Sequence, residues 1–315
     1  MKKIIIILTG TIVVLVVAFE LYLAIGNALA VAQIDREWQT TQVQRIPNLG
    51  STRSLEILPL FEQAAANDNL DAEHGVSYLI KTDHLNILLD VGMTPARLSH
   101  NMQALGVREK DFDAIFISHS HPDHIGGTQA WDVNTVIVGD PAIDLRGKPM
   151  YLPTAMKTVS GQPILVTQPI KIADGVASIG PIAFPDFYPS TFIPHVYLHN
   201  TEQALAVNVE GKGIVLITGC GHPTVERLVA RAQALFNEPV AGIVGGLHYQ
   251  DLTRDQVQPH VAFVAALHPQ LVALSPHDSS PEAMQAFRDA FPSVYQEIQV
   301  GRVISIGRRA ATAVP

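Results

Sequence analysis

The sequence predicts a layered α/β domain that follows an N-terminal transmembrane helix. An uncharged apolar run occupies the first part of the chain, and from about Leu55 short β-rich runs alternate with helical patterns. This alternation is typical of α/β domains. Hydrophobic residues make up 47% of the 315 residues and charged residues only 16%, so the chain has enough apolar material for a packed core and is not intrinsically disordered.

The N-terminal apolar run is long enough to cross a membrane. Ile4–Ile25 carries only one charge, Glu20, and as a helix it would span about 33 Å, whereas the hydrocarbon core of a bilayer is about 30 Å thick. Lys2 and Lys3 precede the run, which predicts a cytoplasmic N-terminus and a domain outside the cytoplasm. Cleavage after Ala28-Leu29-Ala30 is the alternative and would give a secreted protein.

The rest of the chain is predicted to be a tether and one domain. Residues 1–33 form the signal anchor or signal peptide, residues 34–53 are polar and turn-rich, and residues 54–315 show no low-complexity break. Strands are expected at residues 54–60, 75–81, 84–91, 113–118, 134–139, 204–209, 213–219, 241–246, 271–275 and 301–306. Helices are expected at residues 95–105, 123–131, 224–236, 255–267 and 281–291. The proline-rich residues 132–200 are expected to form a wall or lid.

Charge and cysteine content argue against nucleic-acid binding and exclude two kinds of cysteine site. The formal net charge is −8, which argues against nucleic-acid binding because such proteins need a basic face. Cys220 is the only cysteine, so an intramolecular disulfide and a four-cysteine zinc site are both excluded. The 13 histidines remain as the main potential metal ligands.

The densest group of potential ligands follows a predicted buried strand. His119, His121, Asp123 and His124 come directly after DAIFIS. Histidines two apart on an extended backbone point the same way, so the first two can bind one ion. The chain turns at Pro122, so the second pair can hold another ion from a different side. The sequence has no G-x-S-x-G motif and no phosphate loop, which leaves a metal as the evident source of catalysis.

These residues resemble the metallo-β-lactamase superfamily, whose HxHxDH signature they match without substitution. The resemblance implies an αββα sandwich, the metallo-β-lactamase fold, with a usually dinuclear zinc site at strand ends. It also implies that His222 completes the site with His119 and His121, and that His277 joins Asp123 and His124. Asp90, in ILLDVG, resembles the family aspartate that supports the ligands from behind.

The segments AEHGVSYLI, TGCGHP, GGLHY and SPHD resemble one subgroup, the hydrolases similar to the archaeal dihydropterin ribofuranosyl-aminobenzene phosphate synthase. This likeness implies that His248 is a substrate contact or proton donor, with a strand-capping histidine as the alternative, and His74 is a weaker candidate. The carboxylate that commonly bridges the two ions is not evident near His222, where Cys220 stands instead. We interpret Cys220 as a small buried support, with a thiolate ligand as the alternative.

The expected function is zinc-dependent hydrolysis of a small ester, lactone or phosphoester by a metal-activated hydroxide that Asp123 orients. Two zinc ions per chain, a small-molecule substrate and a membrane contact through the N-terminal helix are expected. No nucleic-acid partner is expected, and no oligomeric state is indicated. A non-hydrolytic enzyme like the pterin synthase, an iron redox enzyme and a metal-binding protein without turnover are the alternatives.

Overall fold

The computed structural model describes residues 2–186 and 198–307. The chain divides into two compact units, which are residues 1–42 with 183–200, and residues 43–182 with 201–315. The first unit contains helix α1 (Lys2–Thr40). Strands β11 (Ile182–Asp186) and β12 (Leu198–Glu202) pair as a separate ribbon. The remaining helices and strands all belong to the second unit.

Helix α1 is longer than the predicted membrane span. It runs for 39 residues, and it is the one helix of the described chain that is long and apolar enough to cross a membrane, a test that a signal sequence also passes. The prediction of a tether from residue 34 is wrong for its first part, because the helix continues to Thr40. Gln33 Nε2 donates to Glu37 Oε1 over 3.1 Å, and Thr40 Oγ1 donates to the Arg36 carbonyl over 2.8 Å. Such contacts one turn apart support a polar helix.

The second part of the predicted tether belongs to the folded domain. Leu49 is buried, and its carbonyl accepts a hydrogen bond from the Gly175 N–H over 2.8 Å. Asn208 Nδ2 donates to the Gly50 carbonyl over 2.7 Å. The domain therefore begins near Val43 rather than at residue 54, because this segment satisfies its backbone polar groups on the sheet.

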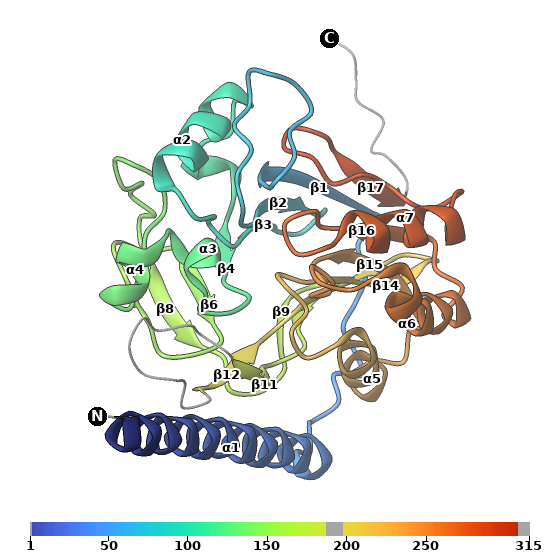
Figure 1. The fold of residues 1–315 in the computed structure, drawn as a ribbon. Coiled ribbons are helices and arrows are strands. Elements are labelled where there is room, and N and C mark those ends of the chain that lie inside the picture. The colour runs from blue at the N-terminus through green and yellow to red at the C-terminus, as the bar shows by residue number, and fades with distance from the viewer. Residues whose placement is uncertain (1, 187–197, 308–315) are drawn as a thin grey trace. The chain divides into compact units, whose positions relative to one another are not determined.

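Two sheets form the centre of the second unit (Figure 1). The larger sheet contains, in spatial order, β17 (Ile304–Gly307), β1 (Ser54–Phe61), β2 (Ser77–Lys81), β3 (Asn86–Leu89), β4 (Ala114–Phe116), β6 (Pro149–Leu152) and β8 (Gln162–Leu165). The smaller sheet contains β16 (Leu271–Leu274), β15 (Val240–Gly245), β14 (Gly213–Ile217), β13 (Leu205–Val209), β10 (Val176–Ser178) and β9 (Ile170–Ala173). Strands β5 (Thr135–Val136) and β7 (Lys157–Thr158) pair separately.

Strand β2 shows how the layers are held together. Tyr78 and Ile80 pack in the core between the two sheets, where they share a cluster with Val215 of β14. Leu79 lies in a second cluster with Leu98 of helix α2 (Pro95–Ala104). Successive side chains of a strand point to opposite faces, so β2, in which the first four residues are all buried, packs on both faces.

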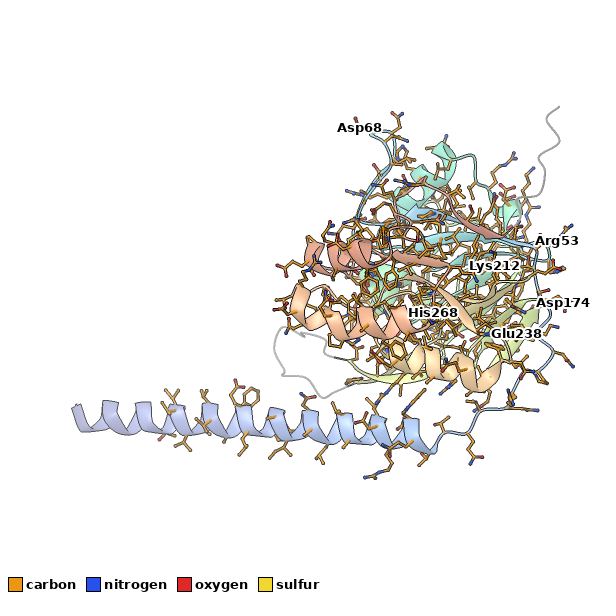
Figure 2. The ribbon with its side chains drawn as sticks, turned by 90° about the vertical axis from the view of Figure 1, so that its right-hand side faces the viewer. Arg53, Asp68, Asp174, Lys212, Glu238 and His268 are labelled. Atoms are coloured by element: carbon orange, nitrogen blue, oxygen red, sulfur yellow. The ribbon has the colours of Figure 1, made fainter. Side chains whose placement is uncertain are left out.

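Helices cover the outer face of each sheet, as Figure 1 shows. The larger sheet carries α2 (Pro95–Ala104), α3 (Pro122–Ile125) and α4 (Thr128–Asp132) on its side, with a short 3₁₀ turn at Glu109–Asp111. The smaller sheet carries α5 (Val225–Leu235), α6 (Arg254–Ala266) and α7 (Pro281–Ala290). This layer order confirms the predicted αββα sandwich. Charged side chains such as Arg53, Asp68 and Lys212 lie on the surface of the domain (Figure 2).

One prediction about local structure is wrong, and one region contains strands that the sequence did not indicate. The helix expected at 123–131 is divided into α3 and α4 by Gly126 and Gly127, whose φ angles of 101° and 99° lie outside the right-handed helical region. The stretch 132–200 contains strands β6 to β12, which were not expected. Its prolines obscure the alternation that identifies strands. Residues 187–197 of the predicted wall or lid lie outside the described residues.

We expect Gly126→Ala to destabilise the domain more than Gly106→Ala. A Cβ at Gly126 would collide with the Ile137 carbonyl oxygen, whereas a Cβ at Gly106, also at positive φ, meets nothing within 4 Å. The control should therefore cost only the left-handed backbone penalty of about 1 kcal/mol, and Gly126→Ala at least about 2 kcal/mol more. Thermal and urea unfolding of the full-length variants measure the difference. Equal losses would show that the close approach at Gly126 is not a constraint.

Candidate metal centre

The predicted site residues stand after parallel strands of the two sheets. Strands β3 and β4 are parallel in the larger sheet, and β14, β15 and β16 are parallel in the smaller one. The carboxyl ends of parallel strands meet at one edge of a sheet, where ligands bind in open α/β sheets. The residues that follow these five strands are, in order, Asp90, His119, Cys220 with His222, His248 and His277.

The first donor group is the predicted set of three histidines. His119, His121 and His222 each offer a nitrogen, and these atoms all lie within 4.8 Å of one another. The ring centroid of His119 lies 4.5 Å from that of His121 and 4.9 Å from that of His222. Burial and the neighbouring imidazoles hold the pKa values of His119 and His222 well below the usual value. Both rings are therefore neutral, which is the form that binds a metal ion.

The second donor group contains a residue that was not expected in it. Asp123, His124, Cys220 and His277 offer ligand atoms that lie within 4.8 Å of one another. Cys220 Sγ lies 3.1 Å from His124 Nε2 and 3.2 Å from His277 Nε2. The interpretation of Cys220 as a support behind the ligands is therefore corrected. The thiol stands among the donors because the chain turns at Gly221, whose φ is 72°, and sends Cys220 and His222 to different groups.

The electrostatics of this group suit a bound cation. Burial raises the pKa of the Cys220 thiol well above its usual value, although His124 lowers it. Burial lowers the pKa of His124, but Cys220, Asp123 and Asp90 raise it well above the usual value. The neighbours of His124 therefore favour a positive charge in this group. A divalent cation that takes the place of the His124 proton would leave a neutral imidazole and would favour the thiolate. One sulfur, two imidazole nitrogens and a carboxylate are donors that zinc accepts. The residues thus fit a metal ion.

Asp90 contacts one of the candidate donor histidines from behind. Its carboxylate is fully buried. Asp90 Oδ1 accepts the Ser118 N–H over 2.7 Å, and Asp90 Oδ2 accepts His124 Nδ1–H over 2.7 Å. A hydrogen bond to the rear nitrogen fixes a histidine's orientation and turns its other nitrogen toward the ligand group.

Two further buried carboxylates support the ligand loops, and the sequence analysis missed both. Glu202 Oε1 accepts the N–H groups of Cys220 and Gly221 over 3.1 and 2.8 Å, and Glu202 Oε2 accepts that of His222 over 2.8 Å. Glu62 Oε1 accepts the His277 N–H over 3.0 Å. Burial raises the pKa of both acids, that of Glu62 to about 7. The only sequence feature that indicates either buried carboxylate is an acidic residue next to a strongly apolar strand.

His74 and His248 flank the two donor groups. His74 Nε2 lies 3.2 Å from Asp123 Oδ2, and the His74 side chain is 54% exposed. His74, the weaker of the two candidates for a substrate contact, therefore lies beside the second donor group. The His248 ring centroid lies 4.4 Å from that of His222. The His248 N–H donates to Asp278 Oδ2 over 3.0 Å, and its φ is 57°. Non-glycine residues at positive φ cluster at functional sites.

Comparison with known proteins agrees with this geometry. The family model described as the metallo-beta-lactamase superfamily matches residues 70–236, more than half of the chain. A 7,8-dihydropterin-6-methyl-4-(beta-D-ribofuranosyl)-aminobenzene-5'-phosphate synthase of Methanocaldococcus jannaschii is 23% identical over 82% of this chain and 98% of its own length. An uncharacterized protein of the same organism is 25% identical over 56% of this chain and 73% of its own length.

One solved structure is similar over the whole domain. It is described as a metal-dependent hydrolase of the beta-lactamase superfamily and aligns with a TM-score of 0.64 at 21% identity, covering 81% of this chain and 100% of its own. At this identity the likeness supports the fold alone.

We expect the purified chain to contain about two zinc ions, one per donor group. His119→Ala should lower the content to about one, because it removes a donor from the first group only. His268→Ala, at an exposed surface position (Figure 2), is the matched control and should bind as much as the wild type. Elemental analysis after dialysis gives the metal content per chain. An unchanged content in His119→Ala would remove this residue from the ligand set.

Proposed function

Because the chain belongs to the metallo-beta-lactamase superfamily, we propose that it is a zinc-dependent hydrolase of a small ester, lactone or phosphoester. The observation that carries the proposal is the contact between the two donor groups. The ring centroids of His119 and His124, one from each group, are 4.1 Å apart. Ions held by two donor groups in contact would be able to act on the same substrate.

Bound zinc would supply an activated water nucleophile and polarise the substrate oxygen. Asp123 can orient that nucleophile, because its carboxylate belongs to the second group and remains ionised. Burial raises the pKa of Asp123, but His124 and His74 lower it well below its usual value. His248, beside His222, can contact the leaving group or donate a proton to it. His74 is half-exposed beside Asp123 and can contact the substrate from the solvent side.

A synthase-like reaction is the second candidate, because the named relative is a synthase that the chain matches over 98% of that protein's length. The same residues would then organise a condensation rather than a hydrolysis. Parallel assays separate the two candidates. One arm offers phosphoester, lactone and β-lactam substrates with and without chelator, and the other looks for the product that the relative's name states. A metal-loaded chain that is inactive in both arms would be a metal-binding protein without turnover.

We expect Asp123→Asn to lower kcat by roughly 10²-fold or more, because the amide cannot accept the proton of the nucleophile. The first donor group does not include Asp123, so one zinc ion should remain bound. Steady-state kinetics on the best substrate of the panel and metal analysis of the same sample provide both values. Full kcat in Asp123→Asn would contradict the orienting role.

We further propose that α1 anchors the chain in the cytoplasmic membrane with the domain outside. The support is the apolar run within α1, which Lys2 and Lys3 precede and Asp35 and Glu37 follow. A secreted protein is the alternative if residues 1–30 are cleaved.

A reporter that is active only outside the cytoplasm, fused after Pro315, tests this topology. We expect signal from this fusion and none from a reporter that requires the cytoplasm. The reason is that the positive-inside rule keeps Lys2 and Lys3 on the cytoplasmic side of the membrane. The reverse pattern would invert the topology. The anchored form should sediment with membranes after a high-salt wash, whereas a soluble form that begins near Val31 would indicate cleavage.

A further inference from the structure

Two serine hydroxyls stand behind two of the candidate ligand histidines. Ser118 Oγ lies 2.9 Å from His119 Nδ1, and it donates to Asp90 Oδ2 over 2.7 Å. Ser275 Oγ lies 2.6 Å from His277 Nδ1 and bonds to Glu62 Oε2. Both serines and both carboxyl groups are buried. The same carboxylate–hydroxyl–imidazole order therefore occurs once in each donor group.

The direction of these hydrogen bonds follows from the chemistry of the carboxylate. An ionised carboxylate can only accept, so each serine O–H must point at the carboxylate. The serine oxygen can then only accept from the imidazole, which must carry its proton on Nδ1. The lone pair of Nε2 is left for the ligand group. His124 Nδ1 donates to Asp90 Oδ2 directly, without an intervening serine.

The surroundings of Glu62 hold this direction firmly. Glu62 Oε1 accepts the N–H groups of Gln63 and His277 over 2.9 and 3.0 Å. Glu62 Oε2 accepts the Tyr78 hydroxyl over 2.7 Å in addition to Ser275. Each oxygen thus has its own pair of partners, and the carboxylate cannot rotate without breaking backbone hydrogen bonds.

We propose that Ser118 and Ser275 are positioning residues. Each serine donates its proton to a carboxylate, that of Asp90 or Glu62. Its oxygen therefore accepts the Nδ1 proton of His119 or His277, which fixes the Nδ1–H tautomer of that ring. The consequence is that Nε2 of each ring is available as a ligand before any metal binds. The inference rests on the proposed metal site, but it concerns the state of the histidines and not the reaction.

The test is ¹⁵N NMR of the full-length, metal-free protein labelled at histidine. The protein is held at pH about 8.5, which is above the pKa of about 7 of Glu62, so that the Glu62 carboxyl group is ionised. We expect His277 to show a protonated Nδ1 and an unprotonated Nε2, and the His277→Gln spectrum identifies its signals. A wild-type His277 protonated at Nε2 would overturn the proposal without any variant.

Glu62→Gln should invert the tautomer. The amide oxygen must take the place of Oε1, which accepts two backbone N–H groups, so the amide NH₂ faces Ser275. The serine then donates its proton to His277 Nδ1, and the ring proton moves to Nε2. Tyr78→Phe is the matched control, because it removes a partner of the same Oε2 atom and leaves Ser275 in place. An unchanged tautomer in Glu62→Gln, or an inverted one in Tyr78→Phe, would contradict the proposal.

Ser275→Ala provides a second variant that removes only a hydroxyl group. We expect a mixture of tautomers at His277 and a zinc affinity roughly 10- to 100-fold weaker, as for other groups that orient metal ligands. Competition with a chromophoric chelator measures the affinity. Wild-type affinity together with a single Nδ1–H tautomer would overturn the proposal. Because the tautomer is recorded without metal or substrate, an inactive enzyme would count against the proposed function and not against this inference.

Discussion

The candidate metal centre depends on carboxylates that are buried beneath it. Asp90, Glu62, Glu202 and Asp278 are all nearly inaccessible to solvent, and each holds a segment that carries a site residue. Burying a carboxylate is costly unless hydrogen bonds replace its water, and here backbone N–H groups and imidazoles supply them. Removing one of these acids would therefore free a ligand loop and leave its donors without a fixed direction.

The sandwich explains why these loops meet. Each sheet contributes parallel strands whose carboxyl ends lie at the same edge, and the core between the sheets, which includes Tyr78 and Val215, fixes their spacing. Each donor group thereby combines residues that follow strands of both sheets, as the neighbouring rings of His119 and His222 show for the first group. A site built on strand ends of a closely packed core is held more precisely than one on free loops.

The sequence could predict what depends on local spacing and little of what depends on distant contacts. The HxHxDH segment and the strands before His222 and His277 were evident from a few adjacent residues. Cys220 was misjudged because its partners His124 and His277 are 96 and 57 positions away. Nothing beside Glu62 or Glu202 in the sequence shows that either carboxyl group turns inward to meet a ligand loop. The prolines of residues 132–200 hid strands for the same reason, since pairing with a neighbour decides whether such a segment is a strand.

Anomalous diffraction at the zinc absorption edge, from crystals of the metal-loaded protein, tests the central claim most directly. We predict two peaks, one among His119, His121 and His222 and the other among Asp123, His124, Cys220 and His277, with the sulfur of Cys220 at about 2.3 Å from the second ion. A single peak at the first group would restrict the centre to one ion. Peaks elsewhere, or none at either group, would contradict the claim that this strand edge is a metal centre.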